Sequence, residues 1–379
     1  MITVFSLIAG MLLTGMNYLV YRQLIVSFLS KKTGLVCISV ITICTVIYIS
    51  GLRIVELPDF LYKTGAVCLG LSFMLFVITL FYMAGKWLFR QVSLPVNQRK
   101  RRFLSLCFKG AIVGAGAGYV STGIYSGKSL PRISTIPIKI ANLQRPLTIA
   151  QITDIHLGVF LQKDFLQAIV HLTNEQDPDL VVITGDIIDM PPEAIGDTLD
   201  PFGQLKTRYG VFCVPGNHEY YYGVNGILAR LAQLGITILG NRTKQIAGIN
   251  IAGVYDLAAL QLQRGPFPNL EAALETRDPA LPTVLLAHQP KFIEHVTPDH
   301  RIDLMISGHT HAGQIVPFSL LVLLDQPYLH GLYHHDSITR IYVSSGAGFW
   351  GPPFRCGAPA EIAVLQLTEE HRSASFLRK

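Results

Sequence analysis

The segment 147–156, LTIAQITDIH, decides the fold because an apolar run ends there in an aspartate and a histidine. The run 147–153 has the length and composition of a buried β-strand. Asp154 and His156 follow it directly. In α/β proteins the carboxyl ends of parallel strands line one crevice, so polar residues at such an end can meet residues from other strands. We therefore expect Asp154 and His156 to lie in a site at one edge of a sheet.

Similar apolar runs recur along the chain and predict the architecture. Amphipathic stretches, such as 163–174 and 225–234, lie between them and are typical of helices. This alternation predicts a layered α/β domain, and stretches with a strand-only pattern allow two packed sheets. The expected strands are 147–153, 180–184, 211–214, 236–239, 249–254, 284–287, 304–307 and 341–343.

Polar residues follow several of these runs and supply a candidate metal site. Carboxylate, amide and imidazole donors without thiolates suit Mn, Fe or Zn, whose identity the sequence leaves open. Seven donors are too many for one ion, but they suit two ions about 3.5 to 4 Å apart that clamp the attacking and leaving oxygens of an in-line displacement. The seven predicted ligands are Asp154, His156, Asp186, Asn217, His288, His309 and His311.

The order of these motifs resembles the calcineurin-like metallophosphoesterases, over about residues 147–367. DxH, GDxxD, GNHE, a lone histidine and GHTH follow one another as in that family. The resemblance implies an α-β-β-α sandwich of two packed mixed sheets and metal-dependent hydrolysis of a phosphate ester. Closer features look like the membrane-anchored YkuE/YaeI-like branch: TDIHLG, GNHEYY, GHTHAGQI and SSGAGFWGPPFRCGAPAEI.

The resemblance also implies residue roles. One ion is held by Asp154, His156 and His311, and the other by Asn217, His288 and His309, with Asp186 bridging them. His218 is the catalytic residue, which stabilises the phosphoryl oxygens or protonates the leaving group rather than binding metal. Asn217 and Arg355 are expected to contact the substrate phosphate.

Several neighbouring residues keep alternative interpretations. Arg355 can pair with a phosphate or form a structural salt bridge. Asp189 and Glu219 can form structural hydrogen bonds or contact metal. The branch usually has glycine after GHTH, whereas this chain has Ala312, which carries a cost if that position needs a positive φ. A disulfide between Cys213 and Cys356 stays open.

The N-terminal third predicts a membrane region. The chain is 50% hydrophobic and 15% charged. Four apolar stretches approach or exceed the length that spans a bilayer, and we prefer four spans to a cleaved signal peptide at the first. Gly110, Gly114 and Gly118 share a helix face, which favours packing within the bundle. The expected spans are 4–20, 34–52, 65–89 and 103–126, and the expected domains are 1–126 in the membrane, a linker at 127–146 and a catalytic domain at 147–379.

The charge pattern predicts the topology and excludes one class of partner. Lys and Arg gather beside the apolar segments, at 22–32 and 86–102, while the globular part is slightly acidic. The basic excess is therefore interpreted as membrane orientation and not as a nucleic-acid surface. By the positive-inside rule these loops are cytoplasmic, which predicts a multi-pass protein of the cell (inner) membrane with an extracytoplasmic catalytic domain.

These observations leave three classes of function. The first is a phosphoesterase attached to the membrane and acting on a lipid-linked or headgroup phosphate. A UDP-diacylglucosamine pyrophosphatase, which cleaves a lipid A precursor, is the alternative substrate assignment, and it requires a site that faces the cytoplasm. The others are a non-catalytic metal-bound scaffold, which the complete ligand set and His218 disfavour, and a transporter with an attached hydrolase. The oligomeric state is left open.

Overall fold

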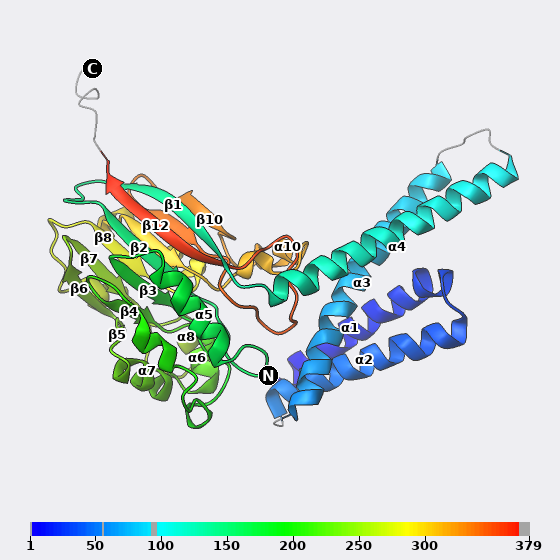
Figure 1. The fold of residues 1–379 in the computed structure, drawn as a ribbon, viewed down its shortest axis with the longest axis horizontal. Helices are drawn as coiled ribbons and strands as arrows, with labels where there is room; N and C mark the ends of the chain where they lie inside the picture. Colours follow the sequence, from blue (N-terminus) through cyan, green and yellow to red (C-terminus); the bar gives the residue numbers. More distant parts are fainter. Residues whose placement is uncertain (1, 55–56, 92–96, 371–379) are drawn as a thin grey trace, which may run out of the picture. The chain divides into compact units, whose positions relative to one another are not determined.

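The computed structural model describes residues 2–54, 57–91 and 97–370, which divide into two compact units (Figure 1). The helical unit extends to Lys128 and also includes Gly351–Cys356, and the sheet unit comprises Ser129–Trp350 and the chain from Gly357 onward. All six cysteines are free. The helices of the first unit are α1 (Ile2–Gln23), α2 (Lys31–Ile54), α3 (Asp59–Gln91) and α4 (Gln98–Lys128).

Three helices in the described part of the chain are long and apolar enough to cross a membrane. These candidate spans are Lys31–Gly51, Asp59–Phe89 and Gln98–Lys128. The expected number of four spans is corrected to three. Helix α1 covers the first expected span, 4–20, but part of that span lies outside the residues whose side chains are described.

The segment Gly351–Cys356 packs inside the helical unit, at glycines of α3 and α4. A Cβ atom placed on Gly70 would lie 2.4 Å from the Phe354 ring, and one on Gly127 would lie 2.4 Å from the carbonyl oxygen of Pro353. The backbone N–H of Arg355 donates to the carbonyl of Gly123 at 3.0 Å. Close packing against this segment therefore depends on these three glycines having no side chain.

The expected glycine face of α4 behaves differently. An added Cβ at Gly110, Gly114 or Gly118 would have no atom within 4 Å among the described residues. The prediction that this face packs within the bundle is therefore wrong for this structure. The spacing of glycines along the helix identifies a shared face but not what covers it.

The sheet unit contains two six-stranded sheets. The first has the order β1-β12-β2-β3-β4-β5 and the second β10-β11-β9-β8-β7-β6. Both are mixed, because β12 runs antiparallel to β2, β10 to β11 and β6 to β7, while the other neighbours are parallel. The strands are β1 (Arg132–Ile140), β2 (Leu147–Ile152), β3 (Leu180–Thr184), β4 (Val211–Val214), β5 (Thr237–Ile238), β6 (Arg242–Ile246), β7 (Ile249–Gly253), β8 (Thr283–Leu286), β9 (Leu304–Ser307), β10 (Gly331–His334), β11 (Arg340–Val343) and β12 (Glu361–Glu369).

Alternate residues of the central strands build three apolar layers. Between the sheets, residues such as Ile149 and Val182 of the first sheet share a core with Val284 and Ile306 of the second. The outer face of the first sheet packs against α5 and α7, and that of the second against α9. The expected α-β-β-α sandwich is therefore confirmed (Figure 1). Helices of this unit are α5 (Lys163–Asn174), α6 (Asn217–Tyr222), α7 (Val224–Gln233), α8 (Ala258–Leu262), α9 (Leu270–Leu274) and α10 (Ser319–Val322).

Strand β1 falls within the segment 127–146, which was expected to be a linker. Its residues pair in parallel with β12 along its whole length, and Ile138 and Ile140 are buried. Pro137 lacks an N–H for the ladder, but β1 lies at an edge of its sheet, where proline is tolerated. Ile136, Ile138 and Ile140 alternate with Pro137 and Lys139, which is a strand signal, but the polar and proline-containing composition of the segment favoured a linker.

Candidate active site

The turns that follow β2, β3 and β9 hold their polar residues in an unusual backbone conformation. Asp154, His156, Asp186, His309 and His311 have φ values of 54°, 53°, 50°, 71° and 49°. Left-handed backbone is costly for residues other than glycine and persists where the surrounding structure determines it, most often at functional sites. Five such residues at neighbouring strand ends mark this edge of the sheets as the candidate site.

The first ligand group gathers at one end of this edge. Nε2 of His156 lies 3.0 Å from Nε2 of His311, which lies 3.3 Å from Oδ1 of Asp154. The backbone N–H of His309 donates to the Asp154 carboxylate at 3.0 Å and fixes its orientation. All three side chains are buried, and their donor atoms lie close enough together to share one ion.

The second ligand group lies beside the first and shares a carboxylate with it. Nε2 of His288 lies 3.2 Å from Oδ2 of Asp186 and 3.1 Å from Oδ1 of Asn217, and His309 completes the group. The same Oδ2 of Asp186 lies 3.8 Å from Nε2 of His156 in the first group. The structure thus brings the seven predicted ligands together and places Asp186 between the two groups.

Hydrogen bonds to the other ring nitrogens prepare two histidines for metal binding. Nδ1 of His288 donates to the carbonyl of Thr184 at 2.7 Å, and Nδ1 of His156 lies 3.1 Å from the Asp189 carboxylate. A proton on Nδ1 leaves the lone pair of Nε2 free for a metal. Burial lowers the pKa of His309 to about 3, so this imidazole is neutral. The residues present therefore fit a pair of divalent ions.

His218 lies next to the ligand groups and pairs with Asp189. Its Nδ1 lies 2.6 Å from Oδ1 of Asp189, and its Nε2 lies 3.9 Å from Oδ2 of Asp186. Burial alone would lower the pKa of His218, but these two carboxylates outweigh that effect and raise it to about 9. The imidazole is thus a proton donor at neutral pH. The structural hydrogen bond considered for Asp189 is present.

Glu219 holds two of the site loops together. Its carboxylate accepts hydrogen bonds from the backbone N–H groups of Asp186 at 2.9 Å, Ile187 at 2.8 Å and Gly216 at 2.7 Å. A charged acceptor that receives several backbone donors is among the stronger buried arrangements. Glu219 therefore fixes the positions of Asp186 and of the turn that carries Asn217 and does not point to a metal.

Aromatic side chains surround His218. The rings of Tyr221 and Trp350 lie 5.2 Å and 6.4 Å from its ring, measured between centroids. Trp350 is 49% exposed, and Gln314 bonds its backbone N–H at 2.9 Å. The sequence motif that contains Trp350 was recognised, but no role was assigned to this residue.

Arg355 lies outside the unit that contains the ligand groups. It belongs to the helical unit, where its side chain is only 1% exposed. A guanidinium buried in this way presents no open face to a phosphate. The substrate contact of Arg355 therefore stays a prediction.

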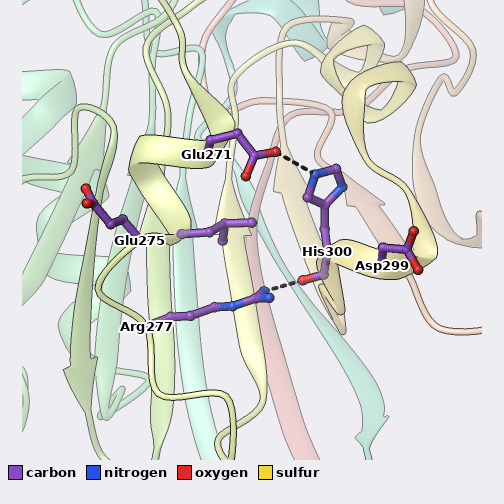
Figure 2. Close-up of a pocket in the computed structure, with 6 residues that line it drawn as sticks. Glu271, Glu275, Arg277, Asp299 and His300 are labelled. Atoms are coloured by element: carbon purple, nitrogen blue, oxygen red, sulfur yellow. Dashed lines mark hydrogen bonds and ion pairs between the residues drawn. The ribbon is translucent and has the colours of Figure 1, made fainter.

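A separate open pocket of about 340 Å³ lies at the other edge of the second sheet. It is lined by residues that lead into β8 and β9 rather than follow them, among them Arg277 and His300. Figure 2 shows the imidazole of His300 beside Glu271, with Nε2 and Oε1 3.1 Å apart, and Arg277 donating to the carbonyl of His300. These bonds pair Arg277, His300 and Glu271 with one another, and the pocket is remote from the strand ends that carry the ligand groups.

The comparisons with known proteins agree with this geometry. The family model for calcineurin-like phosphoesterases matches residues 147–313. A metallophosphoesterase of Helicobacter pylori is 44% identical over 319 residues, which cover 84% of this chain and 85% of the relative. The chain belongs to the calcineurin-like metallophosphoesterase family. It is therefore a metal-dependent hydrolase that acts on phosphate esters.

Other relatives link this metallophosphoesterase to membranes. A transmembrane protein with a metallophosphoesterase domain from Bos taurus is 36% identical over 65% of this chain and 59% of its own length. The YkuE metallophosphoesterase of Bacillus subtilis is 32% identical over 58% of this chain and 78% of its own. A solved dimetal phosphatase from Danio rerio aligns at 15% identity with a TM-score of 0.37, over 59% of this chain and 99% of that protein. The three apolar helices and the transmembrane relatives together indicate a membrane protein.

Proposed function

We propose that this metallophosphoesterase uses two metal ions to hydrolyse a phosphomonoester, phosphodiester or pyrophosphate bond at a membrane. The observation that carries the proposal is the position of Asp186. Its Oδ2 atom lies within 4 Å of a histidine in each ligand group and of His218. One carboxylate between two sets of ligands is the arrangement expected of a site that holds two ions side by side.

The proposed ligands divide as the two groups do. Asp154, His156 and His311 hold one ion, while His288, His309 and Asn217 hold the other, and Asp186 contributes to both. When bound, such ions supply positive charge to the phosphoryl oxygens and lower the pKa of water so that it can attack. Oxygen and nitrogen donors alone support Mn, Fe or Zn as the metal.

His218 acts in this proposal on the leaving group. Bond cleavage at phosphorus leaves negative charge on the departing oxygen, and Nε2 of a protonated His218 can donate its proton there. Asp189 accepts from Nδ1 and holds the ring so that Nε2 faces Asp186 and the ligand groups. The attacking water supplies the oxygen gained by the phosphate; because the leaving group takes its proton from His218, one proton of that water restores His218 and the other stays on the phosphate or passes to solvent.

The membrane attachment favours a lipid-linked or headgroup phosphate as the substrate. The sheet unit follows α4 after three residues, which tethers the candidate site to the helical unit. The basic loops 22–32 and 86–102 support an extracytoplasmic site on the cell (inner) membrane. A UDP-diacylglucosamine pyrophosphatase activity is the second candidate, and it requires the opposite orientation.

Purified full-length chain loaded with Mn²⁺ tests the proposal on three substrates in parallel. An aryl phosphodiester tests chemistry alone, whereas phospholipid vesicles and a nucleotide diphosphate lipid test the substrate class. Hydrolysis that requires the metal supports the proposal, and the preferred substrate decides between the two candidates. A metal-loaded protein that is inert toward all three would contradict it.

A further inference from the structure

Four leucines on and just after α10 form an exposed apolar surface in the sheet unit. Leu320 and Leu324 are 66% and 83% exposed, and Leu321 and Leu323 are about half exposed at 54% and 46%. We call these four side chains the leucine face. Single exposed leucines are ordinary, but a contiguous apolar patch on a soluble surface marks an interaction site.

The leucine face is fixed to the turn that carries His311. Helix α10 packs against the turn His311–Gly313. A Cβ on Gly313 would lie 2.4 Å from Cα of Ser319, the first residue of α10. The two backbones approach so closely that only glycine fits at position 313, which places the helix directly against the turn. Whatever covers the leucines therefore lies beside a proposed metal ligand.

The chain leaves the helical unit next to this face. Gly357 follows directly after the segment Gly351–Cys356, which packs among the glycines of α3 and α4. A Cβ on Gly357 would lie 2.7 Å from Cγ2 of Val316, four residues before Leu320. Val316, which precedes the leucine face in the sequence, thus lies beside the residue that directly follows a segment packed at glycines of two candidate membrane spans.

A second connection is also short. Helix α4 ends at Lys128 and β1 begins at Arg132, so three residues lie between them. Three extended residues reach about 10 Å. Both connections tether the sheet unit to helices that are candidate membrane spans.

We propose that the leucine face inserts into the headgroup and acyl boundary of the bilayer in which the chain's own helices lie. The lipid surface is the partner that these connections bring to the leucines. A short helix with bulky apolar side chains enters this boundary without crossing it. Trp350, half exposed beside His218 and one residue before the packed segment, has the side chain favoured at the same depth. Insertion brings lipid phosphates to the His311 turn.

The proposal rests on membrane anchoring and not on catalysis, so a binding measurement tests it. The full chain contains two tryptophans, Trp87 and Trp350. In a Trp87→Phe, Trp350→Phe background, Leu324→Trp places a single fluorophore on the leucine face. Ile338→Trp, at a site 40% exposed in the turn between β10 and β11, is the matched control. The single variant Trp350→Phe keeps Trp87, within the span Asp59–Phe89, as its only tryptophan and reports whether the helices are embedded in the bilayer.

Each variant is reconstituted in phosphatidylcholine vesicles with and without brominated acyl chains. We expect tryptophan at position 324 to lose as large a share of its emission as Trp87, with a shift to shorter wavelength, while tryptophan at 338 is not quenched. Equal quenching at 324 and 338 overturns the proposal. A shift at 324 without quenching means that protein covers the leucines, either this chain's helices or a second copy, and overturns it as well. If Trp87 is not quenched, the helices are not embedded in the bilayer, and the proposal is overturned because it depends on that anchoring.

Discussion

Nδ1 of His218 lies 2.6 Å from Oδ1 of Asp189, and this pair connects the proposed proton donor to the metal ligands. The same carboxylate oxygen lies 3.1 Å from Nδ1 of His156. The two histidines held in this way lower the pKa of Asp189 against the opposing effect of its burial. One ionised carboxylate therefore sets the orientation of a ligand and of the acid together.

Replacing His218 should affect esters according to their leaving groups. We expect His218→Ala to slow hydrolysis of an alkyl phosphate by about 10²- to 10⁴-fold, the range of a general acid. The loss of hydrolysis rate should be smaller for a nitrophenyl ester, because nitrophenolate departs without taking up a proton. The measurement is kcat on both esters. His171→Ala, which removes an exposed histidine paired with Glu175, is the control and should change neither. Equal losses on both esters would argue against proton donation by His218.

Asp186→Asn should remove metal together with activity. The neutral amide keeps the size of the side chain but loses the charge shared between the two ligand groups. We expect a fall in metal affinity beyond the roughly 10- to 100-fold typical of outer-shell partners. Metal content by mass spectrometry and ester hydrolysis are measured on the same sample. Asp197→Asn, at an exposed carboxylate paired with Lys163, should retain both metals. Full metal content in Asp186→Asn would contradict the bridging position.

Glu361 should make the stability of the sheet unit dependent on pH. Its buried carboxylate accepts from Tyr342 at 2.9 Å and the N–H of Ser345 at 3.0 Å, and it lies 3.2 Å from Nε2 of His330. Burial opposes ionisation, but the hydrogen bonds and His330 lower the pKa from an ordinary 4.5 to about 2. Because the folded pKa is depressed, this stabilisation is complete above pH 4.5 and is lost as pH falls toward 2.

The variant Glu361→Gln tests that dependence. At neutral pH we expect it to lower the free energy of unfolding by about 1.5–3 kcal/mol, the contribution of hydrogen bonds to a charged group. The difference in melting temperature from the parent should narrow as pH falls from 4.5 to 2. Glu275→Gln, at an exposed site, serves as control and should melt with the parent. A difference that does not vary with pH would show that the charge of Glu361 does not stabilise the fold.

The sequence predicts the central strands and the gathering of polar residues at their ends for one physical reason. Strands β3, β4 and β9 are buried on both faces, so their apolar runs are continuous and end where the polar turn begins. Asp186, Asn217 and His309 each follow such an end within three residues. At these strand ends the sequence pattern alone locates the site residues, because the end of each apolar run is also the edge of the sheet where the residues gather.

Other features depend on contacts that the sequence does not show. Strand β1 alternates strictly only from Ile136 to Ile140, and its full length pairs because β12 offers a partner for every residue. Arg355 stands in a motif that resembles a phosphate site, but Phe354 packs at Gly70 and Gly123 and carries it into the helical unit. The left-handed backbone at Asp154 and His156 is likewise imposed by neighbouring loops and not by residue type.

Ala312 occupies a left-handed position, with φ 52° and ψ 26°, as suspected from the glycine usual there. Ala312→Gly should therefore remove a cost of about 1 kcal/mol. We expect the melting temperature of the sheet unit to rise by about 2–4 °C. Ala259→Gly is the matched control. Ala259 is buried inside helix α8, so glycine there should lower the melting temperature. A fall with Ala312→Gly would mean that the loop is not strained at this residue.

Gly127→Ala should expel the segment Gly351–Cys356 from its place in the helical unit. The added Cβ meets the carbonyl oxygen of Pro353 at 2.4 Å, and backbone cannot yield as a flexible side chain can. Arg355, 1% exposed in the parent, should then become a site of cleavage by trypsin. Fragments are identified by mass spectrometry under limited proteolysis. Gly110→Ala, where the new Cβ has no atom within 4 Å among the described residues, is the matched control and should leave Arg355 resistant. Cleavage at Arg355 in the parent, or resistance in Gly127→Ala, would show that the glycines of α4 do not hold this segment.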